Sequence, residues 1–197
     1  MRKLLFLPVL LLSLFVGNTV FSADFQKGLD AYNKKDYATA LREWKPLAKQ
    51  EHALAQHNLG VMYAKGQGVP RNYKAAVTWC TLAAEKGDVS AQYSLGWMHD
   101  KGVGVPQNDK TAVKWYRLAA KQGYAGAQGD LGAMYAFGRG VTKDYVEAYK
   151  WGNLAAARGN ERAERLMDMV ATIMTPTQVE IAQKLARECV KKNYKGC

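Results

Sequence analysis

The chain has 197 residues, enough for one domain with a buried core, and its 48% hydrophobic and 23% charged content excludes a wholly disordered protein. The composition fits neither a collagen-like chain nor a protein with several membrane spans. Lys and Arg number 28 against 17 Asp and Glu, a net charge of +11, and the scarcity of serines and histidines weighs against a hydrolase.

Residues 1–23 have the pattern of a signal peptide. A basic start, Met1–Lys3, precedes an apolar run over 4–16 that is too short to cross a bilayer about 30 Å thick but suits a signal-peptide core. We expect cleavage after Ala23, or alternatively after Ser22; a permanent N-terminal anchor is the competing interpretation. No cysteine is present here for lipid attachment. The prediction is a periplasmic or secreted protein with no integral membrane segment after cleavage.

Residues 24–52 predict a helical hairpin. Tyr32 lies near the end of its first helix, and Asp36 opens a second helix that carries Trp44 and Leu47.

Three consecutive units of 36 residues with the same pattern follow, which indicates a stacked repeat architecture. Each unit contains a Leu-Gly pair, a Gly-x-Gly-Val segment, an alanine, a tryptophan, a Leu-Ala-Ala run and a closing glycine. The Leu-Gly pairs are Leu59-Gly60, Leu95-Gly96 and Leu131-Gly132, and the tryptophans are Trp79, Trp115 and Trp151.

Each unit is predicted to form two helices separated at the Gly-x-Gly segment. Asn72, Asn108 and Asp144 follow that segment and are expected to cap the second helix, because a short polar side chain accepts hydrogen bonds from free backbone N–H groups. The glycine of each Leu-Gly pair has no Cβ, so the partner helix can approach closely.

A fourth unit begins at Glu161 and loses the pattern near Ala171. The segment 175–178, Thr-Pro-Thr-Gln, is a strong helix start, and the last helix is expected to run to about Lys192. The sequence therefore predicts an all-α protein of ten helices and no strand, with repeats over 53–171 and a C-terminal capping helix and tail over 172–197.

These repeat residues resemble the Sel-one-like repeat family, a relative of the tetratricopeptide repeat. The resemblance is close over 53–159, and residues 24–52 resemble a degenerate tetratricopeptide-like hairpin. It implies a right-handed α/α superhelix whose concave face, lined by the first helix of each pair, binds protein partners. Some exported bacterial members resemble regulators of envelope signalling, secretion or host contact, and a few bind cell-wall ligands.

No motif of catalysis or of cofactor or metal binding is present. The Gly-x-Gly-Val turns follow helices and lack the residues that complete a dinucleotide-binding or phosphate-binding loop. His52, His57 and His99 do not have zinc-ligand spacing, and Ser90 and Ser94 lie in no nucleophile motif. The sequence leaves open whether carboxylates that are distant along the chain form a pair in the folded protein. We expect no enzyme, no cofactor and no metal site.

The cysteines differ in their expected state. Cys80 takes a helix position like that of Tyr116, which favours a packed thiol over a nucleophile. Cys189 and Cys197 lie at and beyond the end of the last helix, and in an oxidising compartment they are expected to form a disulfide that pins the tail. A frayed tail with free thiols is the alternative.

The last fourteen residues concentrate positive charge. This stretch contains five basic residues and a single acidic residue, Glu188. The basic residues are Lys184, Arg187, Lys191, Lys192 and Lys195. A solvated helix face explains them, and an anionic partner, such as an acidic protein surface or an envelope polymer, is the sharper alternative. Nucleic acid is not expected, because basic and aromatic residues do not alternate.

The leading functional hypothesis is a monomeric, non-catalytic scaffold of the bacterial envelope that binds a protein partner in its concave groove. A carbohydrate or peptidoglycan-fragment binder is the alternative, and a cell-wall or β-lactam hydrolase the third. The predicted groove residues lie two positions before and two positions after the leucine of each Leu-Gly pair, with one acid nearby. They are Tyr93 and Trp97, His57 and Val61, Gly129 and Ala133, and Asp100. Tyr93 and Trp97 packing against the next unit is the competing interpretation.

Overall fold

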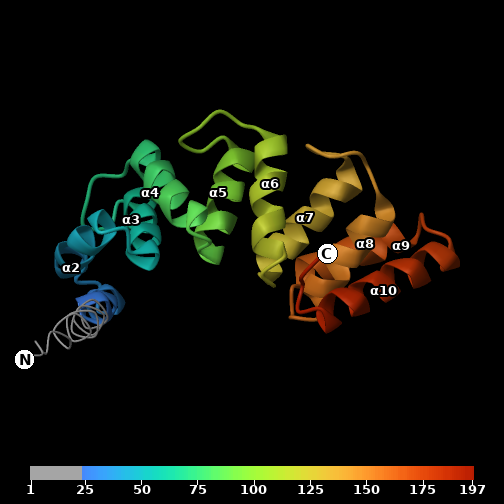
Figure 1. Cartoon of the computed structure of the whole chain (residues 1–197). Coiled ribbons are helices and arrows are strands. Elements are labelled where there is room, and N and C mark those ends of the chain that lie inside the picture. Colours follow the sequence, from blue (N-terminus) through green and yellow to red (C-terminus); the bar gives the residue numbers. More distant parts are fainter. Residues whose placement is uncertain (1–23) are drawn as a thin grey trace, which may run out of the picture.

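The computed structural model describes residues 24–197, so the predicted signal peptide lies outside the described residues. Residues 24–33 are helical, and nine further helices follow along an arc (Figure 1). They are α2 (Tyr37–Lys49), α3 (Ala53–Lys65), α4 (Tyr73–Glu85), α5 (Val89–Lys101), α6 (Asp109–Ala120), α7 (Ala125–Phe137), α8 (Tyr145–Ala156), α9 (Glu161–Ala171) and α10 (Pro176–Lys191). Residues 24–197 contain ten helices and no strand, which confirms the predicted right-handed helical solenoid.

Side-chain caps begin the second helix of each repeat, as the sequence predicts. The side chains of Asn72, Asn108 and Asp144 each accept a hydrogen bond from the backbone N–H three residues on, at 2.9–3.0 Å. The first helices end on glycines in the left-handed conformation, for example Gly102 with φ of 68°. An L-residue rarely adopts this conformation, so glycine is the residue that lets the chain turn there.

A buried glutamine ties each repeat to the hairpin before it. Gln56, Gln92 and Gln128 recur at the 36-residue step, and the Nε2 of each donates to a backbone carbonyl of the preceding helix at 3.0–3.2 Å. Buried backbone carbonyls need a partner, and these side chains supply one at every junction.

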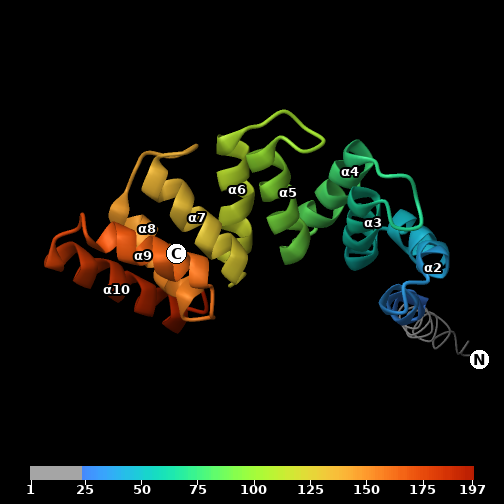
Figure 2. The same ribbon diagram turned by 180° about the vertical axis from the view of Figure 1, so that it is seen from behind.

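The last helix covers the outer side of the final repeat. Helix α10 packs against α8, as both views show (Figure 2). Leu154 on α8 is buried, whereas the equivalent Leu82 and Leu118 are exposed. The leucine of the Leu-Ala-Ala run is thus a core residue only in the repeat that α10 covers, while the first alanine of the run is buried in every repeat.

Candidate functional site: two hollows along the first helices

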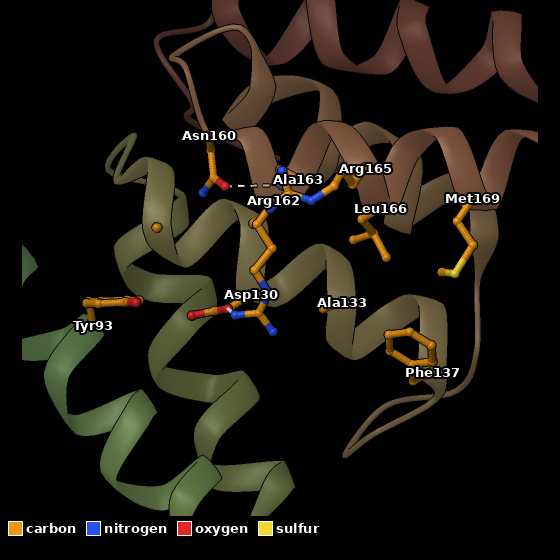
Figure 3. Close-up of a pocket in the computed structure, with 12 residues that line it drawn as sticks. Tyr93, Asp130, Ala133, Phe137, Asn160, Arg162, Ala163, Arg165, Leu166 and Met169 are labelled. Carbon is orange, nitrogen blue, oxygen red and sulfur yellow. Dashed lines mark hydrogen bonds and ion pairs between the residues drawn. The ribbon is translucent and has the colours of Figure 1, made fainter.

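Two hollows open along the row of first helices. The larger hollow, of about 520 Å³, lies between α5, α7 and α9 (Figure 3). It is lined by Tyr93, Gly126, Gly129, Asp130, Ala133, Phe137, Asn160, Arg162, Ala163, Arg165, Leu166 and Met169. The smaller hollow, of about 270 Å³, is lined by Val61, Ala64, Lys65, Cys80, Tyr93, Ser94, Trp97 and Met98. Tyr93 lines both hollows and therefore lies between them.

Tyr93 and Trp97 differ in how far they are exposed in the groove and how far they pack against neighbouring helices. Tyr93 is half-buried, with its ring 5.8 Å from that of Tyr116 on α6 of the same unit and 4.8 Å from that of Tyr124, which precedes α7. A Cβ on Gly126 of α7 would lie 3.3 Å from Tyr93, so this ring packs in part against the next unit. Trp97 keeps 41% of its surface exposed at the smaller hollow. The pair thus combines an anchored ring with an open one.

Small residues form the floor of the larger hollow. Gly129 and Ala133 occupy the same repeat positions as Tyr93 and Trp97 and leave the space empty that large side chains would fill. A Cβ on Gly129 would stand 2.9 Å from Asn160 Nδ2. The missing side chain at Gly129 therefore lets Asn160 approach the backbone of α7 closely.

One carboxylate faces into the larger hollow. Asp130 lies 3.4 Å from Arg162, and burial raises the pKa of its carboxyl group, although the charge of Arg162 opposes this. Burial and the neighbouring Asp130 raise the pKa of Tyr93 to about 12, so the phenol is neutral at physiological pH. Figure 3 shows Tyr93 and Arg162 turned toward Asp130 from opposite sides.

His57 and Val61 occupy the corresponding positions of the first repeat. Val61 lines the smaller hollow, whereas His57 does not line it and has Nε2 3.5 Å from Ser94 Oγ. Burial lowers the pKa of His57 and favours the neutral imidazole. Ser94 lies in the middle of α5, whose backbone N–H groups bond within the helix, so its own helix offers no oxyanion donors.

Asp100 does not line either hollow, contrary to its predicted place in the groove. Its carboxylate is buried and bonded to Lys101 at 2.8 Å and to Arg139 at 2.5 Å. Asp100 follows Gly96 by one helical turn, so it lies toward the side of α5 that meets its partner helix. Arg139, between the two glycines of the last Gly-x-Gly segment, folds back onto it and onto Asp109.

The cysteines lie away from the larger hollow. Cys80 packs against Gly60 with its thiol pKa raised to about 12 by burial, which leaves it protonated. Cys189 and Cys197 are within bonding distance, with Cα atoms 5.5 Å apart. The five basic residues near them are exposed on α10 and the tail and make no ion pair with any described residue.

Residues 24–197 contain no cluster of three or more His, Cys, Asp or Glu residues that would hold a metal ion. Within the same residues no helix has both the length and the apolar character that a membrane span requires.

The sequence prediction missed the wall that α9 contributes to the larger hollow. Continuing the 36-residue step by one more unit leads from Gly129 to Arg165 and from Ala133 to Met169, and both line the hollow. The signal was therefore present, although the Leu-Gly pair that marks the earlier units is absent there.

Comparisons with known proteins agree with this architecture. The Sel1 repeat family matches residues 53–88, 89–124 and 125–160. A Sel1 repeat protein from Oxalobacter formigenes has a similar structure, with a TM-score of 0.68 and 31% identity over 84% of this chain and 75% of that one. A protective antigen present in uropathogenic Escherichia coli strains, which displays an SLR fold, has a TM-score of 0.62 and 26% identity. That match covers 88% of this chain and 46% of the antigen.

No curated protein matches the chain. The three consecutive repeat matches span more than half of its length and agree in register with the helix pairs α3–α4, α5–α6 and α7–α8. The chain belongs to the Sel1 repeat family.

Proposed function

We propose that this chain is a non-catalytic scaffold that captures an extended segment of a partner protein along the two hollows. Sel1 repeat proteins are in general non-catalytic scaffolds for protein–protein interactions, and family membership supports the proposal. The observation that carries it is the exposed Trp97 beside an anchored Tyr93, with a hollow on each side of the pair.

The physical argument rests on area and rigidity. An aromatic side chain brings a large contact area and loses little conformational entropy when it binds, so partly exposed rings in a groove are effective anchors. Tyr93 is held by Tyr116 and Tyr124, which leaves less motion to lose on binding. The small side chain of Ala133 on the floor gives room for the bound segment.

Export to the periplasm or beyond is part of the proposal. The apolar run over 4–16 supports it, as does the short distance between Cys189 and Cys197, because disulfides persist in oxidising compartments. N-terminal sequencing of the protein from a periplasmic or secreted fraction tests it. A chain that starts at Asp24 or Ala23 is expected, and a chain that retains residues 1–23 would contradict export by cleavage.

The binding surface is tested with paired substitutions. Tyr93→Ala/Trp97→Ala should abolish partner capture from an envelope extract, and the Trp97→Ala change alone should lower the melting temperature little because this ring is exposed. Leu82→Ala/Leu118→Ala is the matched control, since it removes exposed apolar side chains from the second helices. Capture that survives in the folded Tyr93→Ala/Trp97→Ala protein would show that the pair is core and not site.

A second candidate is the binding of a carbohydrate or peptidoglycan fragment. The grouping of Tyr93 and the exposed Trp97 at one groove favours it, because aromatic faces present apolar area with polar groups nearby. Titration with muropeptides, followed by the fluorescence of Trp97 against the Trp97→Ala variant, distinguishes it from protein binding.

A further inference from the structure

We propose that the larger hollow selects an acidic partner segment, in which a Glu or Asp side chain lies close in sequence to a large apolar one. This inference rests on the proposed function and specifies the chemistry of its ligand. It follows from where the charges of the first helices lie, which of them are exposed, and what flanks them.

The first three of these helices present almost no negative charge. Helices α3, α5 and α7 together contain two acidic residues, Asp100 and Asp130. Their side chains are 8% and 19% exposed, and each already lies beside an arginine, Arg139 and Arg162 respectively. A basic ligand would therefore find no free carboxylate on these helices.

The positive charges of the larger hollow are open by contrast. The side chains of Arg162 and Arg165 on α9 are 75% and 70% exposed. Arg162 meets Asp130 at 3.4 Å, and Arg165 meets the exposed Glu161 at 3.6 Å. A guanidinium group has five N–H donors, and these long single contacts leave most of them free for a carboxylate of the ligand.

The remaining acids of α9 do not reverse this balance. Glu161, Glu164 and Asp168 all lie on α9, but none of them lines the hollow. Lys65, at the end of α3, adds a cation to the smaller hollow. Lys101, at the equivalent position of α5, lies close enough to Asp130 to oppose the rise in its pKa. The groove is thus electrostatically complementary to an anionic segment.

An apolar patch lies beside the arginines. Phe137 and Met169 are exposed large side chains that line the same hollow together with Leu166. Figure 3 shows these three residues at one end of the hollow, with Arg162 and Asp130 between them and Tyr93. A ligand with a carboxylate over the arginines can place a neighbouring large side chain on this patch, so the two features should lie close together in its sequence.

The test uses pools of short fluorescent peptides bound to the mature chain. One position is fixed as Glu, Gln or Lys, a neighbouring position is fixed as Leu, and the other positions are randomised. The Glu pool should bind about tenfold more tightly than the isosteric Gln pool, a difference typical of a charge-assisted contact. Raising the salt concentration should weaken the Glu pool more than the Gln pool.

Two double variants locate the effect. Arg162→Gln/Arg165→Gln should still fold, because both side chains are exposed, and should remove the Glu preference so that the Glu and Gln pools bind alike. Arg187→Gln/Lys191→Gln removes the same charge from α10 and should keep the preference. Equal binding of the Glu and Gln pools, or a preference for Lys, would overturn this inference and leave the proposed function standing. Binding of no pool would overturn the proposed function and this inference with it.

Discussion

A close helix crossing can be tested at Gly96, where α5 meets α6. A Cβ at this position would stand 2.6 Å from Cδ1 and 2.8 Å from Cε1 of the Tyr116 ring. Carbon atoms in contact normally lie about 3.5–4.0 Å apart, so the overlap is close to 1 Å. Tyr116 is fully buried, so its ring cannot relieve the overlap by turning into solvent.

Two opposing effects set the magnitude for Gly96. Forcing extra carbon atoms into a packed core costs about 1–3 kcal/mol, while replacing a mid-helix glycine by alanine gains about 1 kcal/mol of helix propensity. Gly96→Ala should therefore lower the free energy of unfolding by about 0–2 kcal/mol. Gly96→Val gains less propensity and adds two further methyl groups, so we expect a loss of about 1–3 kcal/mol.

Urea denaturation followed by circular dichroism measures both variants, and a double-mutant cycle isolates the clash. In a Tyr116→Ala background the ring is gone, so Gly96→Ala should become favourable by up to about 1 kcal/mol. The coupling between the two sites is then about 1–3 kcal/mol. An unchanged denaturation curve for Gly96→Val, or the same effect of Gly96→Ala in both backgrounds, would refute a close crossing here.

Two further predictions concern thiols and acid stability. Thiol titration of the native protein should detect almost no reactive group, because burial raises the pKa of Cys80 to about 12, and denaturation without reductant should reveal one thiol. Three thiols would refute a bond between Cys189 and Cys197. Burial opposes ionisation of Asp100, but hydrogen bonds from Lys101 and from Arg139 outweigh this effect and lower the pKa of Asp100. The ionised carboxylate therefore stabilises the fold above about pH 4, and this contribution is lost as the pH falls further. Arg139→Ala should lower the free energy of unfolding by about 2–3 kcal/mol at pH 7, measured by urea denaturation, which is less than for a fully buried pair. This difference from the wild type should shrink below about pH 4. A difference that does not depend on pH would contradict the prediction.

The helix pairs were predictable because the same local sequence signals occur in each of the three repeats. The caps at Asn72, Asn108 and Asp144 and the crossing glycines depend only on neighbours within one unit. The same periodicity placed Gly129 and Ala133 on the face of Tyr93, and both line the larger hollow with it.

Contacts between units were harder to predict, because they depend on where a loop folds over its neighbour. The pairing of Arg139 with Asp100 joins residues 39 positions apart through one loop residue. The middle residue of the equivalent loops is Gln67 or Val103, so the repeat pattern gives no hint of an ion pair there. The buried state of Leu154 likewise depends on α10, which lies outside the repeats.

The larger hollow follows from variation at two repeat positions whose backbone does not change. One position carries Tyr93, Gly129 and Arg165 in successive units, and the other carries Trp97, Ala133 and Met169. Bulky side chains in the outer two units therefore flank a gap made by the small residues of the middle one, whereas the Leu-Gly pairs that hold the helices together point elsewhere. A solenoid of this kind can change its ligand by substitutions on this face at little cost in stability, because the residues that select the ligand are separate from those that pack the fold.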